Sequence, residues 1–277
     1  MAITITPEEK HILKSVSIPP RPEALLQFSE ECKNPEPDIG IISNILQSDI
    51  GISAAILQVT NSSAFRRAKE IESIDQAIMM LGLKRLIPLV KAVALKAAVG
   101  DDPSMQSFWE EQTVIAQFCT KVCKILNKPN LANHAYMLGL FHAVGIVILN
   151  QHFESFNKIV EYANKRGWDT AAQAQLKYFK TNHATIGALL AQQWRLPKVM
   201  INIIYYQHDV EGIYKSTELD RLGLDLLSIL KIARHCTYIN LKPDSEDPDW
   251  DIIKDDLMDH LGMEEEQLNE ILETLTE

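Results

Sequence analysis

Apolar residues recur every three to four positions along almost the whole chain, and short runs that alternate apolar and polar residues are nearly absent. This period is typical of amphipathic helices, so the pattern predicts an all-α protein. Helix starts carry capping sequences: Thr6-Pro7-Glu8-Glu9 has the form of a capping box with proline at the first helical position, and Ser73-Ile74-Asp75-Gln76 repeats it. The chain is therefore expected to fold as helices joined by tight turns.

The predicted helices fall into two groups. Short helices begin at Pro22, Asp38 and Asp49, and another follows Gly82, in which Pro88 should cause a kink or mark the first turn. Further along, longer helices are predicted at 105–126, 130–150, 154–166, 169–180, 182–194, 197–207 and 219–239, with two short ones after residue 248.

A domain boundary is predicted at residues 100–104, which combine turn formers, a charge pair and a break in the period. The chain then divides into an N-terminal helical lobe, 1–102, a second helical lobe, 103–240, and an acidic C-terminal helical extension, 241–277.

The most apolar predicted helix, 130–150, contains the weakly charged run 135–149. This run is shorter than the roughly 20 apolar residues that cross a bilayer, so a buried helix is expected and no membrane partner. The first ten residues lack the basic region and long apolar stretch of an export signal, which favours a cytoplasmic location.

The formal net charge of −10 is concentrated at one end of the chain. Residues 244–277 hold 14 acidic side chains and one lysine, which leaves about +3 for the rest. The acidic helices are expected either to face solvent or to bind a basic surface, whose candidate residues are Arg66, Arg67, Lys69, Lys84, Arg85, Lys91 and Lys96. The overall charge argues against nucleic acid as a partner.

Of the four cysteines, only Cys119 and Cys123 are close in sequence. A spacing of four fits one helix face better than a zinc knuckle or a redox loop. Core thiols are therefore expected.

Three histidines of the second lobe lie on apolar predicted helices: His142, His183 and His208. Singly, each fits a hydrogen-bonded core or surface histidine. Together they look like a metal site with parts missing, because a hydrolytic centre built from imidazoles usually needs carboxylates as well. The residue after His142 is Ala143, which offers only a methyl group.

The sequence motifs around these histidines resemble those of a known family. Leu138–Leu149 is similar to the helix of HD-superfamily phosphohydrolases in which adjacent His and Asp are followed by glycine, and His183–Pro197 with His208 resembles the downstream half of that pattern. Four earlier segments are similar to the N-terminal half of HDOD domains: 18–23, 49–54, 60–65 and 73–86. The resemblance covers about residues 15–240 and implies an all-α, two-lobed helical HDOD fold with a degenerate metal site.

The resemblance also implies where that degenerate site lies. Its positions are Glu111, His142, Ala143, His183, His208 and Arg234. Ala143 replaces the Asp of the HD pair and Arg234 replaces the closing Asp, so two anionic ligands are lost and a cation is added. Ile146 stands at the position where relatives carry a lysine after the glycine. The Gly-Tyr-Pro motif of the related HD-GYP proteins is missing from the sequence. No catalytic residue, no tight metal and no cofactor are therefore expected.

HDOD domains are thought to be mostly regulatory, and the resemblance implies a non-catalytic bacterial signal-transduction module that binds a protein or a small ligand. A regulatory protein partner is expected. The candidate recognition loop contains Asn61, Ser62, Phe65 and Arg66, since a polar, aromatic and cationic loop on a rigid scaffold suits recognition. Helix capping by Asn61 and packing by Phe65 would explain these two residues equally well.

Two alternatives stay open. In the first, the chain is a metal-dependent phosphohydrolase with a reduced HD site, in which His142, His183 and His208, with Glu111, hold one divalent metal. Arg234 separates this from the non-catalytic hypothesis, because a guanidinium that enters the cleft would exclude the metal. In the second, the cleft binds a nucleotide-like or phosphorylated ligand through Arg234 and Lys231.

Overall fold

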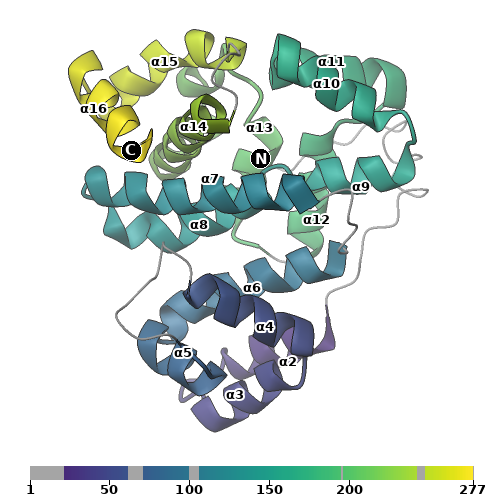
Figure 1. Ribbon diagram of the computed structural model, residues 1–277, viewed down its shortest axis with the longest axis vertical. Coiled ribbons are helices and arrows are strands. Elements are labelled where there is room, and N and C mark those ends of the chain that lie inside the picture. Colours follow the sequence, from purple (N-terminus) through teal and green to yellow (C-terminus); the bar gives the residue numbers. More distant parts are fainter. Residues whose placement is uncertain (1–21, 62–70, 100–105, 195, 242–246, 277) are drawn as a thin grey trace. The chain divides into compact units, whose positions relative to one another are not determined.

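The computed structural model describes residues 22–61, 71–99, 106–194, 196–241 and 247–276, and every regular element within these ranges is a helix (Figure 1). The all-α prediction is confirmed. The chain divides into two compact units, one of residues 19–106 and the other of residues 107–277 together with 1–18. The Thr6 capping box and the predicted boundary segment 100–104 lie outside the described residues.

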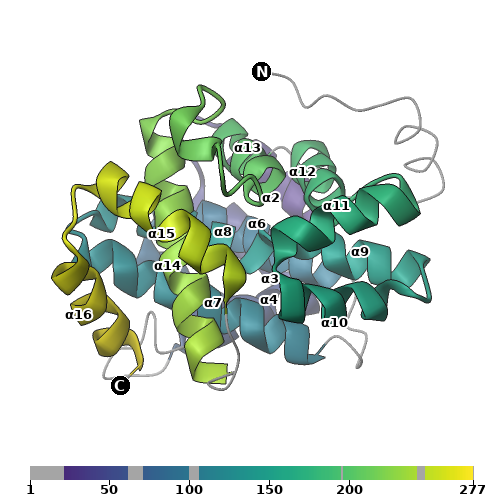
Figure 2. The same ribbon diagram turned by 90° about the horizontal axis from the view of Figure 1, so that it is seen from above.

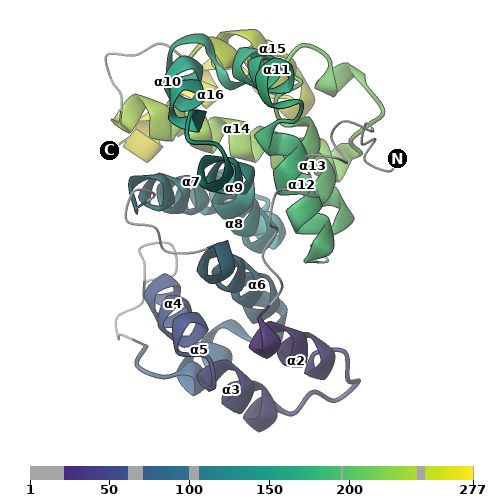
Figure 3. The ribbon, with the colours of Figure 1, turned by 90° about the vertical axis from the view of Figure 1, so that its right-hand side faces the viewer.

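The unit of residues 19–106 is a small bundle of short helices (Figure 3). Side chains cap several of them at the predicted starts: the Asp38 carboxylate accepts from the backbone N–H groups of Gly40 and Ile41, and the Asp49 carboxylate accepts from that of Ile52. The helices are α2 (Glu23–Glu31), α3 (Ile39–Gln47), α4 (Ile50–Thr60), α5 (Ile74–Leu81) and α6 (Leu83–Val99).

Helix α6 packs against α2, α4 and α5. It begins at Leu83 and continues through Pro88, so this proline does not mark the first turn of the helix. The buried apolar side chains that form the core of this unit include Phe28, Ile42, Leu46, Ile52, Ile56, Leu86 and Val90.

The second unit is built around one long helix, α14 (Arg221–Leu241), which is buried along much of its length. Helices α8, α13, α15 and α16 pack against it, and α10 and α11 form a separate hairpin (Figure 2). The other helices are α7 (Gln106–Ile125), α8 (Ala132–Phe141), α9 (Val144–His152), α10 (Phe156–Arg166), α11 (Trp168–Phe179), α12 (His183–Gln193), α13 (Lys198–Tyr206), α15 (Pro248–Leu261) and α16 (Glu265–Thr276), with 3-10 turns η2 (Pro129–Leu131) and η3 (Ile213–Lys215).

The single helix predicted over 130–150 is wrong: α8 ends at Phe141 and α9 begins at Val144. The Gln207 side chain donates to the His142 carbonyl at 2.6 Å, while the Ile146 N–H bonds the Ala143 carbonyl instead. The helical ladder is therefore interrupted at His142, because its carbonyl is taken by a residue from another part of the chain.

The stretch Pro129–His152 is long and apolar enough by composition to cross a membrane. Within this unit, however, 83% of its most apolar window is buried against protein. Such burial is typical of core helices, which can be as long and as apolar as a membrane-spanning helix.

Two glycines let α9 and α12 approach closely. A Cβ added at Gly145 would overlap the carbonyl oxygen of His183 and lie 2.8 Å from the backbone nitrogen of Gly187. Larger residues would therefore separate the two helices. This contact of backbones brings the α8–α9 junction next to the first turn of α12.

The acidic C-terminal segment forms α15 and α16, which bury Ile253, Leu257, Leu268 and Ile271 and pack against α14. Most of its described carboxylates are exposed, as expected for a solvated acidic face, and Lys254 pairs with Glu265 at the surface. Asp249 is buried, and the side chains of Asp247 and Asp256 are partly buried. The buried cysteines Cys119, Cys123 and Cys236 are free thiols, which confirms the core-thiol prediction for Cys119 and Cys123.

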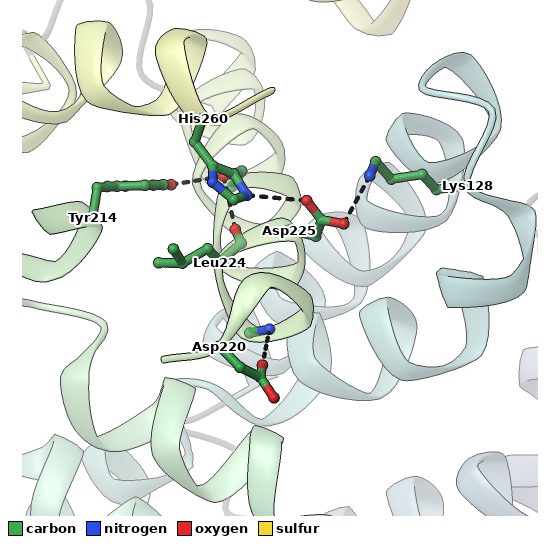
Figure 4. Close-up of polar contacts among 8 residues, drawn as sticks. Lys128, Tyr214, Asp220, Leu224, Asp225 and His260 are labelled. Carbon is green, nitrogen blue, oxygen red and sulfur yellow. Dashed lines mark hydrogen bonds and ion pairs between the residues drawn. The ribbon is translucent and has the colours of Figure 1, made fainter. Parts of the chain in front are cut away.

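A polar cluster fixes α15 to α14 (Figure 4). The Asp225 carboxylate accepts from Lys128 Nζ at 2.7 Å and contacts His260 Nε2 at 3.0 Å. Nearby, the Tyr214 hydroxyl lies 2.8 Å from the hydroxyl of Ser228, and the latter donates to the Leu224 carbonyl.

Replacing the central carboxylate of this cluster is expected to destabilise the unit. Asp225→Ala should lower the free energy of unfolding by about 2 kcal/mol, because two mostly buried donors lose a charged acceptor. Asp220→Ala, which removes only the bond to the Gly223 N–H at the start of α14, should cost about 1 kcal/mol. Urea unfolding measures both, with the exposed Asp259→Ala as control; equal stability of the Asp225 and Asp259 variants would contradict the prediction.

Candidate functional site

A cavity of about 300 Å³ lies within the unit of residues 107–277. All six positions of the predicted degenerate site line it, and they come from five parts of the chain. Those positions are Glu111 on α7, His142 and Ala143 at the α8–α9 junction, His183 on α12, His208 just after α13, and Arg234 on α14. The fold therefore brings together residues that are up to 123 positions apart in sequence.

Two of the histidines are hydrogen-bonded to each other: His183 Nε2 lies 2.7 Å from His208 Nε2. The tautomers follow from Gln175, whose Oε1 accepts the backbone N–H of His183 at 2.8 Å and also lies 3.0 Å from His183 Nδ1. An amide carbonyl oxygen has no hydrogen to donate, so His183 Nδ1 carries the proton and its Nε2 holds the lone pair. His208 Nε2–H is then the donor, and His208 Nδ1 is a buried acceptor without a partner among the described residues.

His142 is oriented by its own helix. Its Nδ1 lies 2.9 Å from the Gly139 carbonyl, which can only accept, so Nδ1 is protonated and Nε2 holds a lone pair. The Gln207 bond to the His142 carbonyl holds the backbone in place. Sequence reasoning missed Gln175 and Gln207, and no local pattern marks either residue.

All three imidazoles are held neutral. Burial lowers the pKa of His183 to about 3, with a further contribution from the positive charge of Arg234. Burial also lowers the pKa of His142 and of His208 well below the ordinary value; the next contribution is the Arg234 charge for His142 and the neighbouring His183 for His208. The direction follows from the cost of charging a buried imidazole beside a cation.

The free energy of unfolding is expected to fall on mild acidification. Because the pKa of each imidazole is lower in the folded than in the unfolded chain, the unfolded chain binds more protons, so stability is full above about pH 6.5 and decreases below it. For His183 this window extends down to about pH 3. Each histidine should contribute a slope of about 1.4 kcal/mol per pH unit within its window.

Urea unfolding between pH 7.5 and 5.5 measures this slope. His208→Gln should reduce it by about the share of one histidine, whereas substitution of the exposed His152 by Gln should leave it unchanged. A wild-type stability independent of pH over this range would contradict the neutral state of the buried imidazoles.

Positive charge enters the cavity from α14. Arg234 and Lys231 both line it, and only 5% of Lys231 is exposed. The Arg234 side chain therefore enters the cleft, at the position where the family pattern expects the closing Asp. Its guanidinium stays charged at any pH the protein experiences.

Two carboxylates reach the cavity from the segment around the start of α15, which sequence reasoning did not foresee. Asp247 Oδ2 lies 3.0 Å from His235 Nδ1, and His235 stacks on the ring of Trp250 with centroids 4.0 Å apart. Asp249 Oδ2 accepts the backbone N–H of Trp168 at 2.9 Å, at the start of α11.

The position before Trp168 requires glycine. Gly167 has φ +82°, and a Cβ there would overlap Oδ1 of Asp249. The α10–α11 turn and the start of α15 are therefore fitted to each other, and both contribute side chains to the wall of the cavity.

These residues do not fit a divalent metal. Across the described ranges, no group of three or more His, Cys, Asp or Glu side chains is arranged to hold an ion. Glu111, Asp247 and Asp249 line the same cavity as the histidines, but His235 and the Trp168 N–H engage the last two. A fixed guanidinium in the same space opposes a second cation.

Of the candidate recognition loop, the described residues include Asn61. Asn61 ends α4, and its side chain donates to the carbonyl of Ile71 and accepts the N–H of Ile71, both at 2.8 Å. This pairing gives Asn61 a structural role. Ser62, Phe65 and Arg66 lie outside the described residues.

The helical fold and its histidine-lined cavity are compared with known protein families. Residues 18–210 match the family model of the HDOD domain. The chain belongs to the HDOD domain family. The matched segment ends before α14, so Arg234, Asp247 and Asp249 all lie beyond it.

An uncharacterized protein of Treponema pallidum (strain Nichols) is 27% identical over 195 residues, which are 70% of this chain and 38% of that protein. The curated relatives are much longer than the part matched, since the alignments span only 38% and 30% of their lengths.

Solved structures share the fold. A provisionally assigned phosphohydrolase from Shewanella amazonensis SB2B is 23% identical with a TM-score of 0.67, over 95% of this chain and 92% of that one. A provisionally assigned signal transduction protein from Marinobacter aquaeolei VT8 is 20% identical with a TM-score of 0.67, over 95% and 57%. At these identities the likeness establishes the fold alone.

Proposed function

We propose that this chain is a non-catalytic regulatory module of bacterial signal transduction, which acts by binding a small ligand or a protein. The observation that carries this proposal is Arg234, whose guanidinium lines the cavity where an HD phosphohydrolase would place a carboxylate. Ala143 stands at the other lost carboxylate position. Hydrolysis of phosphoesters by Mg²⁺ or Mn²⁺ depends on oxygen ligands, and here the cavity offers neutral imidazoles beside a cation.

The proposal includes a regulatory protein partner and a cytoplasmic location, with no cofactor, nucleic acid or membrane as a partner. The solved structure from Marinobacter aquaeolei VT8, named for signal transduction, is in keeping with such a role.

A metal-dependent phosphohydrolase with a reduced HD site is the second candidate. Glu111 favours it, because this carboxylate lines the same cavity as His142, His183 and His208. A metal would require these side chains to move together, since the structure does not arrange them around one ion. The Arg234 charge weighs against this candidate.

Metal analysis and a hydrolysis screen distinguish the two. The protein is purified without chelator, its bound metals are measured by mass spectrometry, and it is incubated with nucleotides and cyclic dinucleotides in the presence of Mn²⁺. Less than stoichiometric metal and no turnover are expected. Stoichiometric metal with turnover that His142→Ala abolishes, and that substitution of the exposed His152 by Ala leaves intact, would establish the phosphohydrolase instead.

A further inference from the structure

We infer that Asp247 is a built-in competitor for an anion site formed by Arg234 and Lys231, and that a phosphate-bearing small molecule binds this cavity by displacing the Asp247 carboxylate. This inference rests on the non-catalytic function proposed above and names its ligand class.

Lys231 is buried and Arg234 is half-buried. Both charges require compensation by negative charge, because removing a charge from water costs several kcal/mol unless it is paired. Lys231 is 5% exposed, and both Lys231 and Arg234 line the cavity. The carboxylates of Glu111, Asp247 and Asp249 line that cavity, and Asp249 already accepts a hydrogen bond from the backbone N–H of Trp168. Burial alone would raise the pKa of Asp247, but the hydrogen bond to His235 and the positive charges of Arg234 and Lys231 outweigh burial, so the pKa of this carboxyl is lowered.

The position of Asp247 makes it displaceable. It directly precedes α15, which begins at Pro248, and its side chain forms no cap to that helix. Its side chain is hydrogen-bonded to His235 Nδ1 at 3.0 Å, so one imidazole and the attraction of the two cations hold it in place. A carboxylate carries one charge, whereas a phosphate monoester carries nearly two and offers three oxygens to the guanidinium fork.

The remaining walls suit an organic phosphate. Aromatic side chains line the cavity on α7, α11, α14 and α15, including Phe108, Trp168, Tyr238 and Trp250. Neutral imidazoles can donate or accept hydrogen bonds without adding charge. A volume of about 300 Å³ is at the lower end of small-molecule sites and fits a ligand the size of a nucleoside monophosphate.

Displacement of Asp247 would release the start of α15 from the cavity wall. Trp250 and Ile253 line the same cavity from α15, so a bound ligand and the position of this helix are coupled. The acidic surface of α15 would then differ between the free and the ligand-bound protein, which gives a partner something to recognise.

Calorimetric titration of the full chain with inorganic phosphate and with adenosine monophosphate tests this inference. Asp247→Asn keeps an acceptor for His235 and removes the charge, so it should bind each probe at least about tenfold more tightly than wild type. Arg234→Gln should bind at least about tenfold more weakly. The exposed Asp251→Asn and Arg221→Gln make the same charge changes outside the cavity and should stay within about twofold of wild type.

Hydrogen exchange adds a structural readout: each probe should increase exchange in residues 247–253 of the wild type. If well-folded wild type and Asp247→Asn both fail to bind either probe at millimolar concentration, the anion site is refuted. Equal affinity of these two proteins refutes the competitor role. Consumption of adenosine monophosphate during the titration, measured by chromatography, contradicts the non-catalytic function and leaves the site itself standing.

Discussion

The double variant Ala143→Asp, Arg234→Asp is expected to bind Mn²⁺ at least about a thousandfold more tightly than the wild type. Two carboxylates are added beside His142, His183 and His208, and one guanidinium is removed. A unit charge about 4 Å from an ion contributes about 4 kcal/mol at an effective dielectric constant of about 20, which is nearly a thousandfold in Kd. Isothermal titration calorimetry and metal analysis measure the change.

The fold should tolerate this restoration. Ala143 is the N-cap residue of α9 and has no side-chain cap, and aspartate is favoured at such positions. The matched control is Ala132→Asp, Arg221→Asp, which makes the same charge change at the starts of α8 and α14, outside the cavity. A double variant that binds Mn²⁺ no better than this control would show that charge is not what keeps a metal out.

Gly145→Ala is expected to lower the free energy of unfolding by about 3 kcal/mol, because the new methyl group would overlap the His183 carbonyl and force α9 away from α12. For a unit of this size such a loss corresponds to a fall in Tm of roughly 6–12 °C. The spacing of His142 and His183 should change as well, since both lie next to this contact.

Gly212→Ala is the control in the same unit. Its added Cβ would meet only the Asp209 side chain at 3.4 Å, an ordinary contact, and its φ of −126° is open to alanine. Thermal unfolding followed by circular dichroism should show little change for this variant. A Gly145 variant as stable as the Gly212 variant would mean that α9 and α12 can separate at little cost.

Much of the fold could be predicted from local signals. The caps at Asp38, Asp49 and Ser73 form as expected, since a side-chain oxygen that accepts from an N–H two or three residues later depends only on nearby sequence. The break at His142 could not be predicted, because it depends on Gln207, which lies 65 residues further along. A long apolar run with a helical period gives no sign that its hydrogen bonds will be interrupted from outside.

The cavity shows the same division. Its six predicted positions followed from motifs that occur in the same order along the chain as in the family, and all six line one cavity in the structure. Asp247, Asp249 and Gln175 were missed because a single polar residue carries no pattern. The acidity of residues 244–277 was visible as charge, but only the structure shows which of its carboxylates, Asp247 and Asp249, line the cavity.

The family-matched segment ends at residue 210, whereas part of the cavity wall comes from α14 and α15. Proteins that share the matched segment can therefore differ in the residues that line this cavity. The ligand that one relative binds does not by itself predict the ligand of another. A fragment cut at the end of the matched segment would lose Arg234, Lys231 and Asp247 together, so binding studies require a chain that includes α14 and α15.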